Sequence, residues 1–196
     1  MTVILASQSR IRRQMLEAAG VRFDVVVAHV DEEAAKASLR SEGLSPRDQA
    51  DALAELKALS VSQRHTGYVI GADQMLALDA ETLDKPKSTA EARTHLSRLR
   101  GRSHELISAA VVAHEGAVLW RHIETPRLRM RAFSDAFLDE YLTQAGDAAL
   151  HSVGAYQLES VGAQLFERVE GDYFSVLGLP LLPLLAFLRQ HGLMPA

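Results

Sequence analysis

Short apolar runs and apolar stripes at helical spacing alternate along the whole chain. Runs rich in β-branched and aromatic residues predict strands, and apolar residues that recur every three or four positions predict amphipathic helices. The predicted strands cover residues 3–5, 23–27, 68–70, 75–78, 106–113, 117–123, 128–132 and 163–169. The predicted helices cover residues 10–19, 45–61, 88–99, 134–143 and 181–191. Strands and helices therefore mix from one end of the chain to the other.

Turn and capping residues support several of these elements. Ser45-Pro46 and Ser134 are typical helix starts, and Ser88 with Glu91 fits a capping box. His114-Glu115-Gly116 separates two predicted strands as a hairpin turn. Because hairpins are antiparallel and strand–helix–strand units favour parallel pairing, we expect an α/β protein with a mixed sheet.

The length suits a single domain. The chain has 196 residues and no internal repeat, low-complexity tract or obvious linker. We expect residues 1–196 to form one compact domain with a cleft, or two small lobes that share a core and flank the cleft.

Composition removes several classes of function. Lys and Arg number 21 against 25 Asp and Glu, a net charge of −4 that argues against stable nucleic-acid binding. The absence of cysteine excludes thiol nucleophiles, Cys-ligated zinc and iron–sulfur clusters. The longest apolar run, residues 176–188, is interrupted by glycine and proline and is too short to cross a bilayer. No signal peptide is visible, so we expect a cytoplasmic protein with no membrane association.

The first candidate site is the junction between the first predicted strand and helix. Ser7 and Ser9 precede a helix start that carries Arg12 and Arg13. Hydroxyls, backbone N–H groups of a helix N-terminus and guanidinium groups together make an anion site. The ordinary alternative is a serine-capped helix with solvated arginines, although cations at this end oppose the helix dipole and call for an anion.

Carboxylates form the second candidate. Asp73 follows an apolar strand at the sheet edge where open α/β folds place their sites, and it would act as a general base or a hard-metal ligand. A turn aspartate that accepts local N–H groups is the alternative. The acidic stretch 29–33, with Asp31, Glu32 and Glu33, would add ligands for Mg²⁺ or Mn²⁺, although an acidic surface loop is the commoner explanation.

Lysine is scarce, since arginine supplies most of the positive charge. Lys57 and Lys85 are suited to phosphate as compact point charges, and solvated surface lysine is the alternative for each. The sequence lacks the GxxxxGK[ST], GxGxxG and GxSxG patterns and the HxH and HExxH spacings, which argues against a P-loop protein, a dinucleotide-binding protein, a serine hydrolase and a His-ligated zinc enzyme. The residues alone therefore indicate an α/β protein with an anion-and-metal cleft.

Separated motifs along nearly the full length resemble those of the Maf family of nucleoside triphosphate pyrophosphatases. They are Leu5-Ala6-Ser7-Gln8-Ser9 with Arg12-Arg13, Asp31-Glu32, Leu53-Ala54 with Lys57-Ala58, Ile70-Gly71-Ala72-Asp73, Lys85-Pro86, Gly101 with His104, Gly154-Ala155-Tyr156-Gln157, Gly171-Asp172-Tyr173 and Gly178-Leu179-Pro180. Each motif is weak by itself, but their shared order and spacing make the resemblance specific.

The resemblance implies an α/β/α sandwich of the Maf / inosine triphosphatase-like type, with a mixed sheet and a deep central cleft, in a protein that is often a homodimer. It implies metal-dependent hydrolysis of a nucleoside triphosphate, either non-standard, modified or pyrimidine, to the monophosphate and pyrophosphate. Family members are linked to the clearance of unwanted nucleotides and to cell-division arrest. The main alternative is a nucleotide-binding regulator that has lost turnover.

The resemblance also implies roles for single residues. Asp73 corresponds to the proton-accepting aspartate and, with Glu32, would hold Mg²⁺ or Mn²⁺. The residues expected to bind the nucleotide are Ser7, Ser9, Arg12, Arg13, Lys57, Lys85, Gln157 and Glu159. Gln157 and Glu159 would read the base or frame its pocket, and His104 would hold the hairpin.

Departures from the family pattern leave the base open. Glu159, and Gln74 after Asp73, favour the branch that contains 7-methyl-GTP pyrophosphatases. Ile11 stands where an aromatic residue would stack on a methylated purine, which argues the other way.

Overall fold

The computed structural model describes residues 2–79 and 81–195 of the chain. The chain divides into two compact units, each made of separate segments. Unit 1 comprises Met1–Gln74, Ser108–Glu124 and Gly178–Ala196, and unit 2 comprises Met75–Ile107 and Thr125–Leu177. Both boundaries inside the sheet fall within long strands, which therefore contribute to both units.

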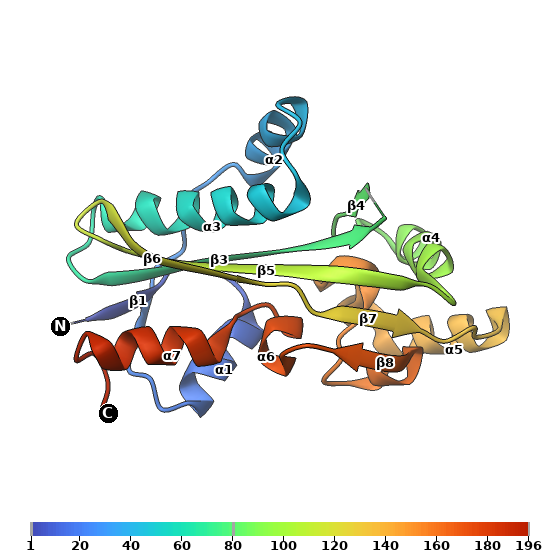
Figure 1. Ribbon diagram of the computed structural model, residues 1–196. Helices are drawn as coiled ribbons and strands as arrows, with labels where there is room; N and C mark the ends of the chain where they lie inside the picture. The colour runs from blue at the N-terminus through green and yellow to red at the C-terminus, as the bar shows by residue number, and fades with distance from the viewer. Residues whose placement is uncertain (1, 80, 196) are drawn as a thin grey trace. The chain divides into compact units, whose positions relative to one another are not determined.

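Unit 1 is built on parallel strands flanked by helices. Its elements are β1 (Val3–Leu5), α1 (Arg10–Ala18), β2 (Asp24–Val25), α2 (Glu32–Ser41), α3 (Pro46–Ser62), the first part of β3 (Tyr68–Leu78), the last part of β5 (Ser103–His114), β6 (Ala117–Glu124) and α7 (Leu181–Gln190). Strand β1 pairs in parallel with β2 and β3, and β6 pairs antiparallel with β5. Figure 1 shows α3 on one side of these strands and α1 and α7 on the other, so unit 1 is layered helix, sheet, helix.

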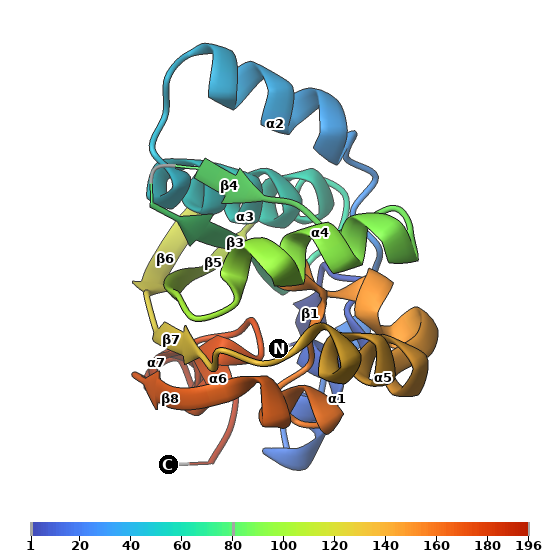
Figure 2. The ribbon, with the colours of Figure 1, turned by 90° about the vertical axis from the view of Figure 1, so that its right-hand side faces the viewer.

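Unit 2 combines antiparallel strands with shorter helices. Its elements are the end of β3, β4 (Glu81–Leu83), α4 (Thr89–Leu99), the start of β5, β7 (Arg127–Met130), α5 (Asp135–Ala145), β8 (Phe166–Glu170), α6 (Tyr173–Val176) and the 3₁₀ helices Gly146–His151, Val153–Ala155 and Val161–Leu165. Helices α4 and α5, which face the viewer in Figure 2, pack against each other. The core of this unit includes Leu76, Leu96, Leu99, Leu106, Leu128 and Leu138.

The strands form one sheet in the order β2-β1-β3-β5-β7-β8, with β4 paired to β3 and β6 paired to β5. Parallel and antiparallel pairs both occur, so the predicted α/β class with a mixed sheet is confirmed. None of the helices in the described part of the chain is both long and apolar enough to span a membrane.

Helix starts follow the predicted capping chemistry. The side chain of Ser45 accepts the backbone N–H of Asp48, and Ser88 and Ser134 act in the same way on α4 and α5. Each predicted helix is present, with its ends shifted by no more than two residues. The hairpin is confirmed as well, because Glu115 and Gly116 both take positive φ between β5 and β6.

The region around the acidic stretch differs from the prediction. Residues 29–33 are not wholly a loop, because Asp31 caps α2 and Glu32 and Glu33 form its first turn. Helix α2 was not predicted because it buries none of its residues, so its sequence carries no core-facing apolar stripe. The predicted break after residue 70 is also wrong, since β3 runs without interruption from Tyr68 to Leu78 and contains Asp73.

Gly71 brings α3 unusually close to β3. A Cβ atom at this position would lie 2.2 Å from the carbonyl oxygen of Ala54 and 2.6 Å from the backbone nitrogen of Ala58. No side chain larger than hydrogen fits at such distances. Helix α3 therefore packs directly on the backbone of the strand at the level of Lys57, which lies between these two contacts in sequence.

Candidate active site

A buried ion-pair cluster lies where α3 meets β3. The ammonium group of Lys57 is 2.7 Å from Oδ1 of Asp73 and 3.0 Å from Oε2 of Glu32. The side chains of Lys57 and Asp73 are each only 8% exposed, whereas that of Glu32 is 49% exposed. The cluster therefore opens to solvent on the side of Glu32.

The alternation of β3 places Asp73 on the face that α3 covers. Gly71 and Asp73 are two residues apart and share this face, and Lys57 faces them from α3. Strand β1 ends at Leu5, whose register partner is Ile70, so Asp73 lies on the part of β3 that extends beyond its parallel neighbour. Although Asp73 does not follow the end of its own strand as predicted, it does lie just past the carboxyl end of β1.

Arg12 covers the edge of β3 that β1 leaves unpaired. The amide of Ala6 donates to the carbonyl of Ile70 at 2.8 Å, which is the last backbone bond between the strands on this edge. The next carbonyl on that edge, that of Ala72, accepts a hydrogen bond from Nη1 of Arg12 at 2.8 Å. Nε of Arg12 donates to the carbonyl of Gly178, also at 2.8 Å. The guanidinium thus replaces a missing strand partner and ties three segments of unit 1 together.

Burial and charge act in opposite directions on Arg12. Its burial lowers the pKa of the guanidinium, and the negative charges of Asp73 and Glu32 oppose that shift. Together with Lys57, Arg12 supplies two positive charges against the two carboxylates. The four side chains form a compact group of balanced charge within unit 1.

The two serines occupy the turn before α1. Oγ of Ser9 accepts the backbone N–H of Arg12 at 3.4 Å, the N-cap interaction expected from the sequence. Oγ of Ser7 is buried and accepts hydrogen bonds from the amide of Ser9 at 3.2 Å and from Nη1 of Arg12 at 3.3 Å. The predicted anion site is therefore a turn in which the side chain of Arg12 donates a hydrogen bond to the hydroxyl of Ser7. Arg13 is exposed on the surface of α1.

The acidic pair divides into two roles. The side chain of Asp31 accepts the backbone N–H of Ala34 and starts α2. That cap directs Glu32, the first residue of the helix, toward Lys57. Glu32 is therefore the residue of this acidic stretch that forms an ion pair with Lys57.

One polar contact beside the cluster was not foreseen. Gln74 lies on the opposite face of β3 from Asp73 and donates from Nε2 to Oγ of the fully buried Ser108 at 2.9 Å. A Cβ on Gly178 would lie 3.5 Å from both Oε1 of Gln74 and Nη2 of Arg12. Ser108 could not be recognised from the sequence as a partner of Gln74, because it is a single serine in an apolar strand and belongs to no motif.

The donor set fits a hard divalent cation that is shared with a ligand. Oδ2 of Asp73 is buried and has no hydrogen-bond partner among the described residues, which is costly unless something else coordinates it. The described residues contain no group of three or more His, Cys, Asp or Glu side chains placed to hold a metal. Mg²⁺ commonly uses one or two carboxylates and completes its coordination with water and phosphate oxygens. Asp73 and Glu32 match that pattern.

The remaining predicted residues belong to unit 2. Lys85 and Glu159 are exposed, and Gln157 is half-buried after the 3₁₀ helix Val153–Ala155. Their participation in one site with Asp73, and the presence of a central cleft, stay predictions.

His104 lies in the core of unit 2 rather than among the charged groups. Its Nε2 is 2.7 Å from the hydroxyl of Tyr156, and its Nδ1 is buried with no partner in the described part of the chain. Burial lowers the pKa of His104 to about 4 and raises that of Tyr156 well above 10. This pair joins two of the sequence motifs, but it lies at the start of β5, away from the turn between β5 and β6, so it does not show the predicted role of His104 in the hairpin.

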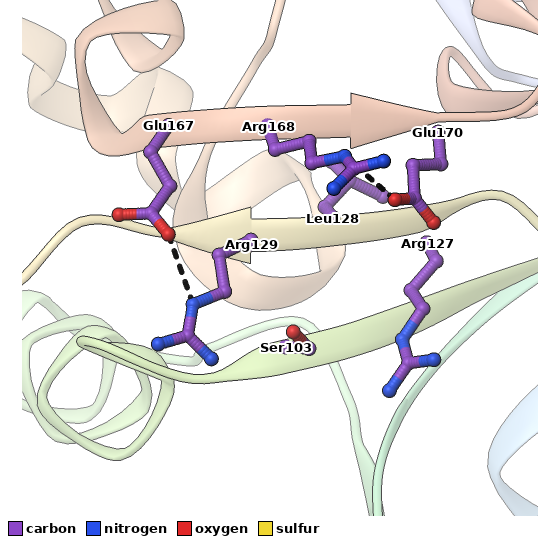
Figure 3. A pocket seen from close by; sticks show the side chains of 7 residues that line it. All are labelled: Ser103, Arg127, Leu128, Arg129, Glu167, Arg168 and Glu170. Atoms are coloured by element: carbon purple, nitrogen blue, oxygen red, sulfur yellow. Dashed lines mark hydrogen bonds and ion pairs between the residues drawn. The ribbon is translucent and has the colours of Figure 1, made fainter.

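A shallow cavity of about 300 Å³ lies on the exposed face of β5, β7 and β8 in unit 2 (Figure 3). It is lined by Ser103, Arg127, Leu128, Arg129, Glu167, Arg168 and Glu170. Arg129 pairs with Glu167 at 3.0 Å, and Arg168 pairs with Glu170 at 2.7 Å. Arg129 and Arg168 are thus each paired with a glutamate, whereas no ion pair of Arg127 is seen among the described residues, so three arginines face two glutamates on this exposed surface.

Comparison with known proteins identifies relatives along the whole chain. The family model described as Maf-like protein matches residues 2–191. A "Nucleoside triphosphate pyrophosphatase" of Caulobacter vibrioides is 55% identical over 97% of this chain and 96% of its own, and one of Hyphomonas neptunium is 52% identical over 100% and 98%. A "7-methyl-GTP pyrophosphatase" of Rhizobium meliloti is 48% identical over 99% of this chain and 98% of its own.

A solved structure from Mycobacterium abscessus, titled a nucleoside-triphosphatase / dITP/XTP pyrophosphatase, is also similar. It is 19% identical, with a TM-score of 0.40, over 68% of this chain and 76% of that one. That similarity is too slight for any functional conclusion.

Proposed function

The chain belongs to the Maf family, and on that premise we propose that it hydrolyses a nucleoside triphosphate to the monophosphate and pyrophosphate. The observation that carries the proposal is the buried Lys57–Asp73–Glu32 cluster, in which one carboxylate oxygen of Asp73 has no hydrogen-bond partner in the described structure. The names of the relatives at 48–55% identity support the same reaction.

In this reaction a water molecule attacks the α-phosphorus and the bond from that phosphorus to the α–β bridging oxygen breaks. The water loses a proton and pyrophosphate leaves with the electron pair of the broken bond. Oδ2 of Asp73 is the proposed acceptor of that proton, since this oxygen has no hydrogen-bond partner among the described residues. Because Asp73 lies within a strand and against α3, its carboxylate is positioned before the nucleotide arrives.

The cations of unit 1 would offset the charge of the triphosphate. Lys57 offers an ammonium with three donors at the buried end of the cluster. Arg12 is bound through Nε and Nη1 to two backbone carbonyls, so we propose that it mainly shapes the site and adds positive potential. Lys85, Arg13, Ser7 and Ser9 complete the proposed phosphate-binding set, and Gln157 and Glu159 the proposed base-binding set.

Asp73 and Glu32 are the proposed ligands of Mg²⁺ or Mn²⁺. A bound ion of this kind would neutralise the negative charge that develops on the phosphoryl oxygens. Removal of divalent metal with a chelator should therefore abolish turnover and leave the fold intact.

We also propose a homodimeric, cytoplasmic enzyme that clears non-standard or modified nucleotides, with a role in cell-division arrest. The choice of base is open. Relatives named for nucleoside triphosphates in general and for 7-methyl-GTP are both similar along the whole chain.

A panel of nucleotides tests the function directly. The protein would be incubated with Mg²⁺ or Mn²⁺ and 7-methyl-GTP, dTTP, UTP, dITP and the four standard ribonucleotides, and the products separated by anion exchange. We expect monophosphate and pyrophosphate in equal amounts from at least one of them. Diphosphate and orthophosphate as the main products would refute the proposal. Tight nucleotide binding without any turnover would instead favour a regulator that has lost catalysis.

A further inference from the structure

The ammonium group of Lys57 lies between the two proposed metal ligands. Its nitrogen is within 3.0 Å of one oxygen from Asp73 and one from Glu32, so it bridges the carboxylates as a shared cation would. With Arg12 nearby, the four side chains sum to zero formal charge. The metal-free site thus has its own internal counter-ion.

The ammonium contacts Oδ1 of Asp73 and Oε2 of Glu32, while Oδ2 of Asp73 has no hydrogen-bond partner among the described residues, so a divalent ion held by both carboxylates would lie close to the ammonium. Two cations a few ångströms apart in a buried site repel each other strongly, because the local dielectric constant is low. Lys57 in this position therefore opposes the binding of a divalent ion to Asp73 and Glu32.

The four side chains differ in how freely they can rearrange. Asp73 is fixed by its strand, and Arg12 by the carbonyls of Ala72 and Gly178. Lys57 has a flexible four-carbon stem, and both of its ion pairs are made by the ammonium group at its end. Glu32 begins α2, a helix that contacts α3 but buries none of its residues. Lys57 and Glu32 are the parts that can move.

We propose that Lys57 takes the place of the metal ion in the empty site, where its ammonium group neutralises Asp73 and Glu32. When metal and nucleotide bind together, the ammonium group leaves these carboxylates and forms an ion pair with a phosphate group. This proposal rests on the proposed function. It makes metal binding without nucleotide weak, because the ammonium must leave two carboxylates with no anion to receive it. With the nucleotide present, a phosphate oxygen accepts the displaced ammonium, so metal and nucleotide strengthen each other's binding reciprocally.

Binding of Mn²⁺ alone, followed by electron paramagnetic resonance of the free ion, tests this directly. Lys57→Met keeps the length of the side chain and removes its charge, and should bind Mn²⁺ about tenfold more tightly than the wild type, or better. Lys57→Arg keeps a cation and should not gain affinity. Arg64→Met removes one positive charge from the exposed turn that follows α3 and should leave affinity within about twofold. Equal or weaker Mn²⁺ binding by Lys57→Met than by wild type would overturn the proposal.

The wild type provides a second readout that does not depend on the folding of a variant. The chain has four lysines, so the side-chain NMR signal of Lys57 can be followed individually. Addition of an α,β-methylene nucleotide with Mg²⁺ should shift this signal, and Mg²⁺ alone at the same concentration should not. A signal that stays unchanged when both are bound would overturn the proposal. Neither measurement requires turnover, so the product assay can fail or succeed independently.

Discussion

Two clusters of acidic and basic side chains in this protein lie in opposite surroundings. In unit 1, Lys57 and Asp73 have side chains that are each 8% exposed. In unit 2, the arginines of the cavity in Figure 3 lie on an open sheet face, with Arg129 47% and Arg168 72% exposed. Both clusters contain ion pairs of ordinary length. Burial, rather than the number of charges, separates the candidate active site from a charged surface.

The physical reason is the cost of removing charge from water. An exposed pair gains little because water solvates each partner nearly as well as the other partner does. A buried pair must be complete, since loss of one member leaves an uncompensated charge. Such a site also stabilises charge that develops on a ligand far more than an open surface does. The buried cluster around Lys57 can therefore stabilise charge on a bound substrate. The exposed side chains of the cavity in unit 2 mainly interact with water.

The largest effect is expected from Asp73→Asn. The variant keeps the size of the side chain but loses the proton acceptor and the charge that faces Lys57, so turnover should fall by about 10²–10⁴-fold. Steady-state rates on the best nucleotide of the panel give the measurement. Glu170→Gln removes the same charge from the exposed cluster and should keep its rate within about twofold. Comparable losses in both variants would remove the distinction between the clusters.

Gly71→Ala should break the buried cluster through packing alone. The added methyl group would overlap the carbonyl of Ala54 and push α3 away from β3, with a loss of about 3 kcal/mol in the free energy of unfolding. Gly20→Ala is the control, because its φ is +73° but nothing lies within 4 Å, and it should cost about 1 kcal/mol. Urea denaturation of the variants compares the two costs. Gly71 itself has an ordinary strand φ, so a loss no larger than that of Gly20→Ala would contradict the expected overlap with α3.

His104 provides a buried group without a counter-ion, and its protonation should set the acid stability of unit 2. The folded-state pKa of about 4 lies below the ordinary 6.5, so the unfolded chain binds a proton that the native protein excludes. His104 then contributes about 2 kcal/mol to the loss of unfolding free energy between pH 7.5 and pH 5, and its contribution levels off below pH 4.

Denaturation at several pH values tests this, with His104→Gln as the comparison. Glutamine is uncharged and keeps a polar group near the hydroxyl of Tyr156. The difference in unfolding free energy between wild type and variant should shrink as the pH falls from 7.5 to 5. A constant difference would mean that His104 titrates alike in both states.

The smallest effect is expected in the exposed cluster. Arg129→Gln removes the ion pair with Glu167 and should change the unfolding free energy by no more than about 0.5 kcal/mol. Salt should reduce even that difference, since exposed charges are screened. Thermal denaturation at low and high salt gives the comparison. A loss above 2 kcal/mol would place this cluster in the same class as the buried one.

The sequence predicted much of this arrangement because local signals are strong in it. Ser45-Pro46 and Ser88 mark the starts of their helices, and His114-Glu115-Gly116 between two apolar runs marks the hairpin. Lys57 and Asp73 were both predicted as site residues, from separate segments of the chain. Their direct contact could not be predicted, because it depends on the close packing of α3 against Gly71.

Features that depend on distant partners were missed. Helix α2 lacks a buried face, so no apolar periodicity marks it. Arg12 was predicted to face the triphosphate, but its bonds to the carbonyls of Ala72 and Gly178 depend on where β1 ends and on a segment 166 residues away. Every residue has a backbone carbonyl, so the sequence does not show which carbonyl accepts a hydrogen bond from Arg12. The structure is needed to identify these acceptors.

Hydrolysis in ¹⁸O-labelled water tests the central claim most directly, namely that the buried cluster activates water for attack at the α-phosphorus. The wild type should release monophosphate that carries one ¹⁸O atom and pyrophosphate that carries none, as read by mass spectrometry. Asp73→Asn should form the labelled monophosphate at a rate about 10²–10⁴-fold lower. Label in the pyrophosphate, or labelled monophosphate formed at an undiminished rate by Asp73→Asn, would contradict the account.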